Sequence, residues 1–191
     1  MLRTDRVAAK YRTDMIRQSN KVAAEAATLT ASTFRGGVTD RLSTRYVTAV
    51  SRLLEDGRQR AARLGGTFYL THREASGIID TVPEVVYAAP MASLRAETSV
   101  LVTGPYTIRR ALAQGVDLEA AVRTAQTRTY GSVQRHVANG ARETVYNSLL
   151  RDSRAIGWAR MSDGRPCPFC AMLVSRGPIY KSAAAAAMGA T

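Results

Sequence analysis

The sequence predicts a mainly α fold: an extended long-helix hairpin or bundle, followed by a small C-terminal module that combines a β-hairpin with a CxxC knuckle. Alanine is abundant while aromatic residues make up only 6% of the 191 residues, a composition that suits closely packed helices better than β-sandwiches. Apolar residues also recur every three or four positions over long stretches, as they do on one face of a helix. At Gly157 this pattern gives way to a turn signal and two cysteines.

A basic helical hairpin is expected over residues 1–66. Its first helix covers residues 5–33, and the two glycines of the FRGG sequence end it. A second helix begins at Thr39 or Asp40, because either residue can cap it, and the LGG sequence at 64–66 ends it. The predicted apolar stripes are Val7, Tyr11, Met15, Val22 and Leu29 in the first helix, and Leu42, Tyr46, Val50, Leu53 and Leu54 in the second.

A helical body is expected over residues 67–156. The TxxE sequence at 71–74 has the spacing of a capping box and predicts a short helix. The Gly-Pro pair at 104–105 predicts the first turn of another helix, where proline is favoured. The apolar stripes of the long helices are narrow. We therefore expect an extended helical body whose apolar faces are covered by neighbouring molecules, including other copies of this chain.

A long helix over about residues 117–155 closes this body. Asp117 is its predicted cap, and apolar residues follow at spacings of three or four. Gly131 and Gly140 lie inside it, where we expect each either to bend the helix or to admit a neighbouring helix.

The remaining residues, 157–191, form the predicted knuckle module. Residues 157–161 are expected to form a strand, and the Asp-Gly pair at 163–164 predicts a tight turn after it. Cys167 and Cys170, the only cysteines of the chain, follow this turn. The module is therefore expected to present both thiols from one turn.

The chain is strongly basic, with a formal net charge of +12. Residues 1–66 carry a net +7 and residues 131–191 a net +5, so the excess lies at the two ends. A solvated face is the ordinary meaning of a helical charge stripe, but this excess favours contact with phosphates or with an acidic partner. The candidate contact residues are six arginines of the second helix: Arg41, Arg45, Arg52, Arg58, Arg60 and Arg63.

The two cysteines allow three interpretations. A redox dithiol of the glutaredoxin type is disfavoured, because that fold places the pair before most of its sheet, whereas this pair lies near the C-terminal end of the sequence. Cys167 and Cys170 are instead two of the four ligands of a tetrahedral zinc site, or they are reduced thiols that pack the module. The only histidines, His72 and His136, lie in predicted helices and are not expected to supply the other two ligands.

The sequence contains no recognisable catalytic motif. It has no P-loop, no GxSxG sequence and no HExxH sequence, so we expect a protein that is not an enzyme. It also lacks an apolar signal region and any apolar run long enough to span a membrane. We therefore expect a protein made in a reducing cytoplasm that has no membrane partner.

The C-terminal stretch GWARMSDGRPCPFCAMLVSRGPIYKS closely resembles the C-terminal motif of phage minor head proteins of the MuF-like group found in actinobacteriophages. In that family a segment with histidine and further cysteine follows, and the sequence departs from the family there. The matching residues are Trp158, Arg160, Asp163, Gly164, Pro166, Cys167, Cys170, Met172, Leu173, Ser175, Arg176, Gly177 and Tyr180.

The resemblance implies a structural minor capsid protein inside the phage head. Such a protein associates with the portal protein, aids head assembly and DNA packaging or ejection, and faces the packaged double-stranded DNA. The major capsid protein is a further implied partner, and zinc is the implied cofactor. The alternative is a basic helical nucleic-acid-binding protein unrelated to capsids.

Overall fold

The computed structural model describes residues 3–80, 83–155 and 172, and it is helical throughout its regular structure, with no strand in these ranges. The chain divides into two compact units, Met1–Ser148 and Leu149–Thr191. The predicted β-hairpin and CxxC knuckle lie outside the described residues, except for Met172. The elements are α1 (Arg3–Phe34), α2 (Asp40–Ala75), α3 (Ser93–Leu101), the π-helix η1 (Val102–Tyr106), α4 (Thr107–Ala113) and α5 (Leu118–Leu150).

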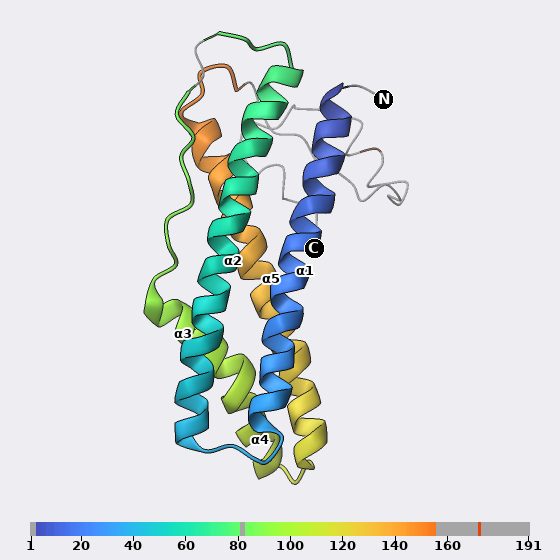
Figure 1. Cartoon of the computed structure of the whole chain (residues 1–191), viewed down its shortest axis with the longest axis vertical. Coiled ribbons are helices and arrows are strands. Elements are labelled where there is room, and N and C mark those ends of the chain that lie inside the picture. The colour runs from blue at the N-terminus through green and yellow to red at the C-terminus, as the bar shows by residue number, and fades with distance from the viewer. Residues whose placement is uncertain (1–2, 81–82, 156–171, 173–191) are drawn as a thin grey trace. The chain divides into compact units, whose positions relative to one another are not determined.

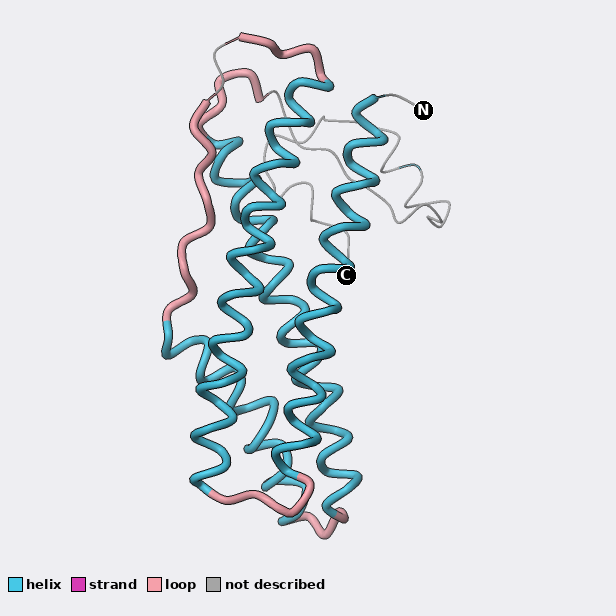
Figure 2. The backbone as a smooth tube through the Cα atoms, in the orientation of Figure 1, coloured by secondary structure: helices cyan, strands magenta, loops and turns pink. Residues whose placement is uncertain are grey.

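Three long helices, α1, α2 and α5, run alongside one another in the first unit (Figure 1). The shorter α3, η1 and α4 follow a bent path beside them, and an extended segment, residues 83–92, runs along the outside of α2 and α5 (Figure 2). The helical hairpin expected over residues 1–66 and most of the expected helical body therefore belong to one packed unit.

The core of this unit is built from small and branched aliphatic side chains. Val22, Val50 and Leu54, all members of the predicted stripes, are at most 2% exposed. Nine of the ten predicted stripe residues of α1 and α2 belong to this core or pack against it, Val7 being the exception, so their burial does not depend on neighbouring molecules as expected. Alanines at the helix contacts allow close approach of the backbones: Ala23, Ala26, Ala61, Ala121, Ala125 and Ala141.

The hairpin between α1 and α2 forms as its local chemistry predicts. α1 ends at Phe34, and Gly37 adopts a φ of 120°, a conformation that favours glycine. Thr39 is the N-cap of α2, because its side-chain oxygen accepts a hydrogen bond of 3.2 Å from the backbone N–H of Leu42.

The predicted end of α2 at residues 64–66 is wrong, since the helix continues to Ala75. Gly65 and Gly66 are packing residues here. A Cβ atom at Gly65 would lie 2.5 Å from the carbonyl oxygen of Ala141 in α5. The expected capping box at 71–74 falls inside the last turns of α2 and starts no new helix.

The Gly-Pro pair at 104–105 does not start a helix either, because it lies inside η1, between α3 and α4. Proline has no backbone N–H to donate, which favours a wider local turn. Gly104 lies against the ring of Tyr46, where a Cβ atom would approach the ring to 2.5 Å. The helix that precedes η1, α3, was not predicted from the sequence pattern.

The long helix α5 begins as predicted, but it ends at Leu150 and not at about residue 155. The Asp117 carboxylate accepts a 2.9 Å hydrogen bond from the backbone N–H of Ala120. Gly140 admits a neighbouring helix, since a Cβ atom there would lie 2.4 Å from the carbonyl oxygen of Arg58 in α2. Gly131 is different, because no heavy atom lies within 4 Å of its Cβ position.

Tyr46 joins the three long helices through a buried hydroxyl. Its Oη lies 2.8 Å from Thr30 Oγ1 of α1 and 3.2 Å from Thr129 Oγ1 of α5. Its ring meets Phe34 edge-on, with 5.0 Å between the ring centroids. Burial raises the pKa of the Tyr46 hydroxyl above its usual value, so this group stays protonated.

Candidate nucleic-acid interface

Four arginines form a straight row on the outer face of α2. Arg41, Arg45, Arg52 and Arg63, called the arginine row below, are all exposed. Their spacings of 4, 7 and 11 residues are close to whole helical turns, so they fall within an arc of about 40° around the helix. Arg60 is also exposed but lies further around the helix.

The guanidinium groups of the arginine row have no carboxylate partner among the described residues. Other exposed arginines of the unit do form such pairs, for example Arg3 with Glu74 and Arg123 with Glu119. Asp56 is exposed on the same side of α2 but is not ion-paired with the row. The row therefore presents four guanidinium groups that are not engaged in ion pairs with the described residues.

The dimensions of the row suit a linear polyanion. Its ends are 22 positions apart, which corresponds to about 33 Å along a helix axis. One turn of B-DNA is about 34–36 Å long. Guanidinium groups bind phosphate oxygens through paired N–H donors, and such contacts fix position without reading sequence.

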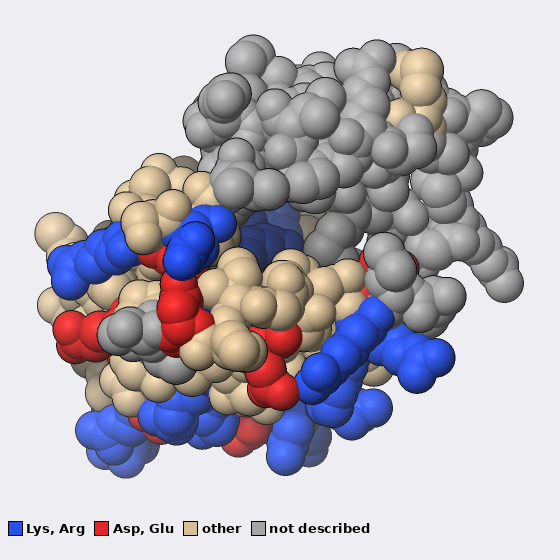
Figure 3. All heavy atoms as spheres, turned by 90° about the horizontal axis from the view of Figure 1, so that it is seen from above, with Lys and Arg blue, Asp and Glu red and all other residues tan. Residues whose placement is uncertain are grey.

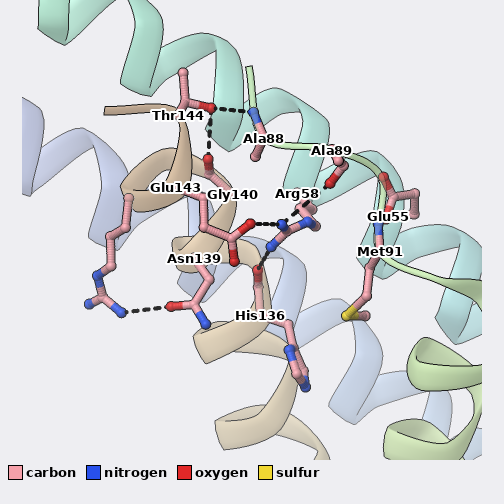
Figure 4. A network of polar contacts seen from close by, with 11 residues as sticks. Glu55, Arg58, Ala88, Ala89, Met91, His136, Asn139, Gly140, Glu143 and Thr144 are labelled. Atoms are coloured by element: carbon pink, nitrogen blue, oxygen red, sulfur yellow. Dashed lines mark hydrogen bonds and ion pairs between the residues drawn. The ribbon is translucent and has the colours of Figure 1, made fainter. Parts of the chain in front are cut away.

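Arg58 does not belong to this surface, which corrects its expected role. It is only 6% exposed, and its guanidinium forms an ion pair with Glu143 of α5. It also donates hydrogen bonds of 3.3 Å to the His136 carbonyl and 3.4 Å to the Ala89 carbonyl (Figure 4). Arg58 therefore joins α2 to α5 and to the extended segment.

Side chains from both helices hold the extended segment in place through its backbone. The backbone N–H groups of Val86 and Ala88 donate to Ser148 Oγ at 3.0 Å and Thr144 Oγ1 at 2.9 Å. The backbone N–H of Met91 donates to the Glu55 carboxylate at 3.1 Å (Figure 4). These contacts satisfy backbone N–H groups of a segment that forms no helix or strand and so has no internal hydrogen-bond partners for them.

Other basic residues that the sequence analysis did not select lie on α1. Arg3, Arg6, Lys10, Arg17 and Lys21 are exposed at helical spacing. Asp14 partly compensates them, through ion pairs with Lys10 and Arg17. Seen along the helices, Lys and Arg side chains project outward with Asp and Glu among them (Figure 3). The net +7 of residues 1–66 was the available signal for this second basic face.

The two histidines have structural environments. His136 is buried, and its Nε2 lies 3.1 Å from Ser99 Oγ. Burial and the nearby Arg135, Arg95 and Arg58 lower the pKa of His136. Burial also lowers the pKa of His72, whose ring lies 5.3 Å from that of Phe68.

The metal-site prediction concerns residues that the structure does not describe, since Cys167 and Cys170 both lie outside the described ranges. Within residues 3–80 and 83–155 and at Met172, no group of three or more histidine, cysteine or acidic side chains could hold a metal ion. No described helix has the length and apolar character needed to cross a membrane.

Comparison with known proteins identifies a family. The model of a family described as "VG15 protein", a family of viral gene products, matches residues 3–190. No curated protein and no solved structure matches the chain.

Proposed function

The chain belongs to the VG15 protein family, a family of viral gene products, and on this premise we propose that it is a minor head protein of a tailed bacteriophage. In this proposal it is a structural component rather than an enzyme. It associates with the portal protein inside the head and aids head assembly and the packaging or ejection of DNA. The resemblance of residues 157–182 to MuF-like minor head proteins supports this assignment.

The observation that supports contact with DNA in this proposal is the arginine row on α2. Four exposed guanidinium groups without carboxylate partners are suited to contact the phosphates of packaged DNA. Such binding is independent of sequence, as a protein that faces a whole genome requires. Each phosphate contact adds about 0.9 to the slope of log affinity against log salt, so the row supplies up to about 3.6.

Exposed apolar side chains on α3 and η1 support a separate contact with a protein, for which we propose the portal. Leu94 is 75% exposed, Leu101 45% and Tyr106 55%. Leu94 and Leu101 are seven residues apart and so share one face of α3. A large exposed apolar face is typical of a protein–protein contact.

The direct test is the composition of virions of the phage that encodes the chain. We expect mass spectrometry of purified virions to detect it in few copies, and cryo-electron microscopy to place it at the portal on the inner side of the head. Its absence from virions, in cells that contain the folded protein, would refute the proposal.

A second test concerns the arginine row. The variant R41Q/R45Q/R52Q/R63Q should enter virions but package DNA less efficiently, and its DNA affinity should lose most of its salt dependence. A matched control, R3Q/R6Q/R17Q/R123Q, removes four exposed arginines elsewhere and should have a smaller effect. Equal defects in the two variants would show that total charge, not the row, is responsible.

A second candidate function is a non-capsid protein that binds nucleic acid, which the same arginine row would equally support. Strong preference for one DNA sequence, together with absence from virions, would favour this alternative.

A further inference from the structure

A pocket of about 380 Å³ lies between the bent path of η1 and α4 and the long helix α5. Two arginines of α5 line it, Arg128 and Arg135, together with four hydroxyl side chains that include Thr107 and Ser132. No carboxylate lines it. The exposed lining is mostly apolar, and its two charged side chains are both positive.

The two guanidinium groups are placed to act together. Arg128 and Arg135 are seven residues apart, which is almost two helical turns, so they lie on the same face of α5. The seven-residue spacing corresponds to about 10.5 Å along the helix axis. Both are exposed, and neither is ion-paired with a carboxylate of the described chain. Arg128 makes only a long contact of 3.5 Å with Thr107 Oγ1. Both side chains are free to bind an anion.

Gly131 lies between the two arginines on the same face and also lines the pocket. Gly57, Gly65 and Gly140 in the long helices are crowded, since a Cβ atom at each would come within 3 Å of a neighbour. At Gly131 no neighbour lies within 4 Å. Glycine destabilises a helix interior relative to alanine, and packing within the unit does not account for it here. A glycine at this position leaves the helix backbone open to close approach by a ligand.

We propose that this pocket binds a phosphodiester group of the DNA backbone. Arg128 and Arg135 supply charge-assisted donors on either side, and the bare backbone at Gly131 lets the phosphate approach closely. The threonine hydroxyls that line the pocket donate to backbone carbonyls, so the two guanidinium groups are its donors to the phosphate. The choice of DNA rests on the proposed function. The pocket adds a phosphate site, on a different element, to the exposed row on α2.

The test is a salt titration of binding to a mixed-sequence DNA duplex by the full chain and its variants. We expect R128Q/R135Q to bind about 10- to 100-fold more weakly at low salt, with a salt slope lower by about 1.8. The control R35Q/R110Q removes two exposed arginines that belong to neither basic face and do not line the pocket, and it should have a clearly smaller effect. Equal losses in the two double variants would overturn the pocket assignment.

A second variant separates the shape of the pocket from its arginines. G131E places a carboxylate on the pocket floor, and it should fold at least as stably as the parent because glutamate favours a helix more than glycine does. We expect its DNA affinity to fall about tenfold, whereas T71E, a charge-matched change at an exposed site near the end of α2, should have little effect. Unchanged binding by G131E, with its fold verified by circular dichroism, would overturn the proposal.

The source of the phosphate is tested by competition at constant ionic strength. Inorganic phosphate should displace DNA from the parent chain and have less effect on R128Q/R135Q. Phosphate binding that leaves DNA affinity unchanged, or stronger competition by polyglutamate, would overturn the assignment to DNA. The outcome is independent of virion composition, because a chain absent from virions refutes the proposed function but leaves the pocket measurements valid.

Discussion

Replacing Gly65 and Gly131 separately by alanine should change stability in opposite directions, although both glycines lie inside long helices. In Gly65→Ala the new Cβ would lie 2.5 Å from the carbonyl oxygen and 3.0 Å from the Cα atom of Ala141. These are backbone atoms, so α2 and α5 must move apart. Overpacking of this kind costs up to about 3 kcal/mol, and the gain in helix propensity offsets about 1 kcal/mol. We expect a net loss of about 2 kcal/mol.

Gly131→Ala is the matched control. Its Cβ would meet no atom within 4 Å, so only the propensity term remains, a gain of about 0.5–1 kcal/mol. For a domain of this size, 1 kcal/mol corresponds to about 2–4 °C in Tm.

Urea unfolding followed by circular dichroism at 222 nm measures both effects directly. The two variants should bracket the parent protein, with Gly65→Ala less stable and Gly131→Ala more stable. If Gly65→Ala proved as stable as Gly131→Ala, the close contact between α2 and α5 would be wrong, and with it the reason that α2 continues past residue 66.

The remaining predictions concern buried polar groups. Arg58→Met should cost about 2 kcal/mol, because the ion pair and two hydrogen bonds are lost, whereas exposed Arg52→Met should stay within about 0.5 kcal/mol; equal unfolding midpoints would contradict the burial of Arg58. Tyr46→Phe should cost about 1 kcal/mol, measured in the same way, and no loss would mean that its hydroxyl bonds contribute nothing. Because the pKa of His136 is lowered in the folded state, the unfolded chain binds more protons below about pH 6.5. Stability should therefore fall as the pH falls below that value, and His136→Gln should weaken this dependence; an unchanged pH profile would refute it.

Helix starts were predictable because they depend on residues next to one another. Thr39 and Asp117 cap helices through hydrogen bonds to backbone N–H groups three residues later. The apolar stripes of α1, α2 and α5 followed from helical periodicity, which is also local information. The family resemblance rested on residues 157–182, most of which lie outside the described residues.

The roles of glycines and arginines were harder to predict, because each of these residue types has different roles at different positions. Gly37 ends the hairpin turn with a positive φ, whereas Gly65 continues a helix and makes room for another. Arg52 and Arg58 belong to the same basic stripe in sequence. Arg58, however, follows Leu54 by four residues and precedes Ala61 by three, so it lies on the apolar side of α2. That spacing was a signal that the sequence analysis could have used.

By itself, the sequence determined that the chain is basic and helical, where most of its long helices begin, and which side of each is apolar. Those properties arise from composition, capping and periodicity within a few turns. Only the tertiary structure decided which glycines are contacts, which arginines are buried, and that Arg128, Gly131 and Arg135 line one pocket with η1 and α4. These outcomes depend on which helix lies opposite, and no local pattern contains the position of a neighbour distant in sequence.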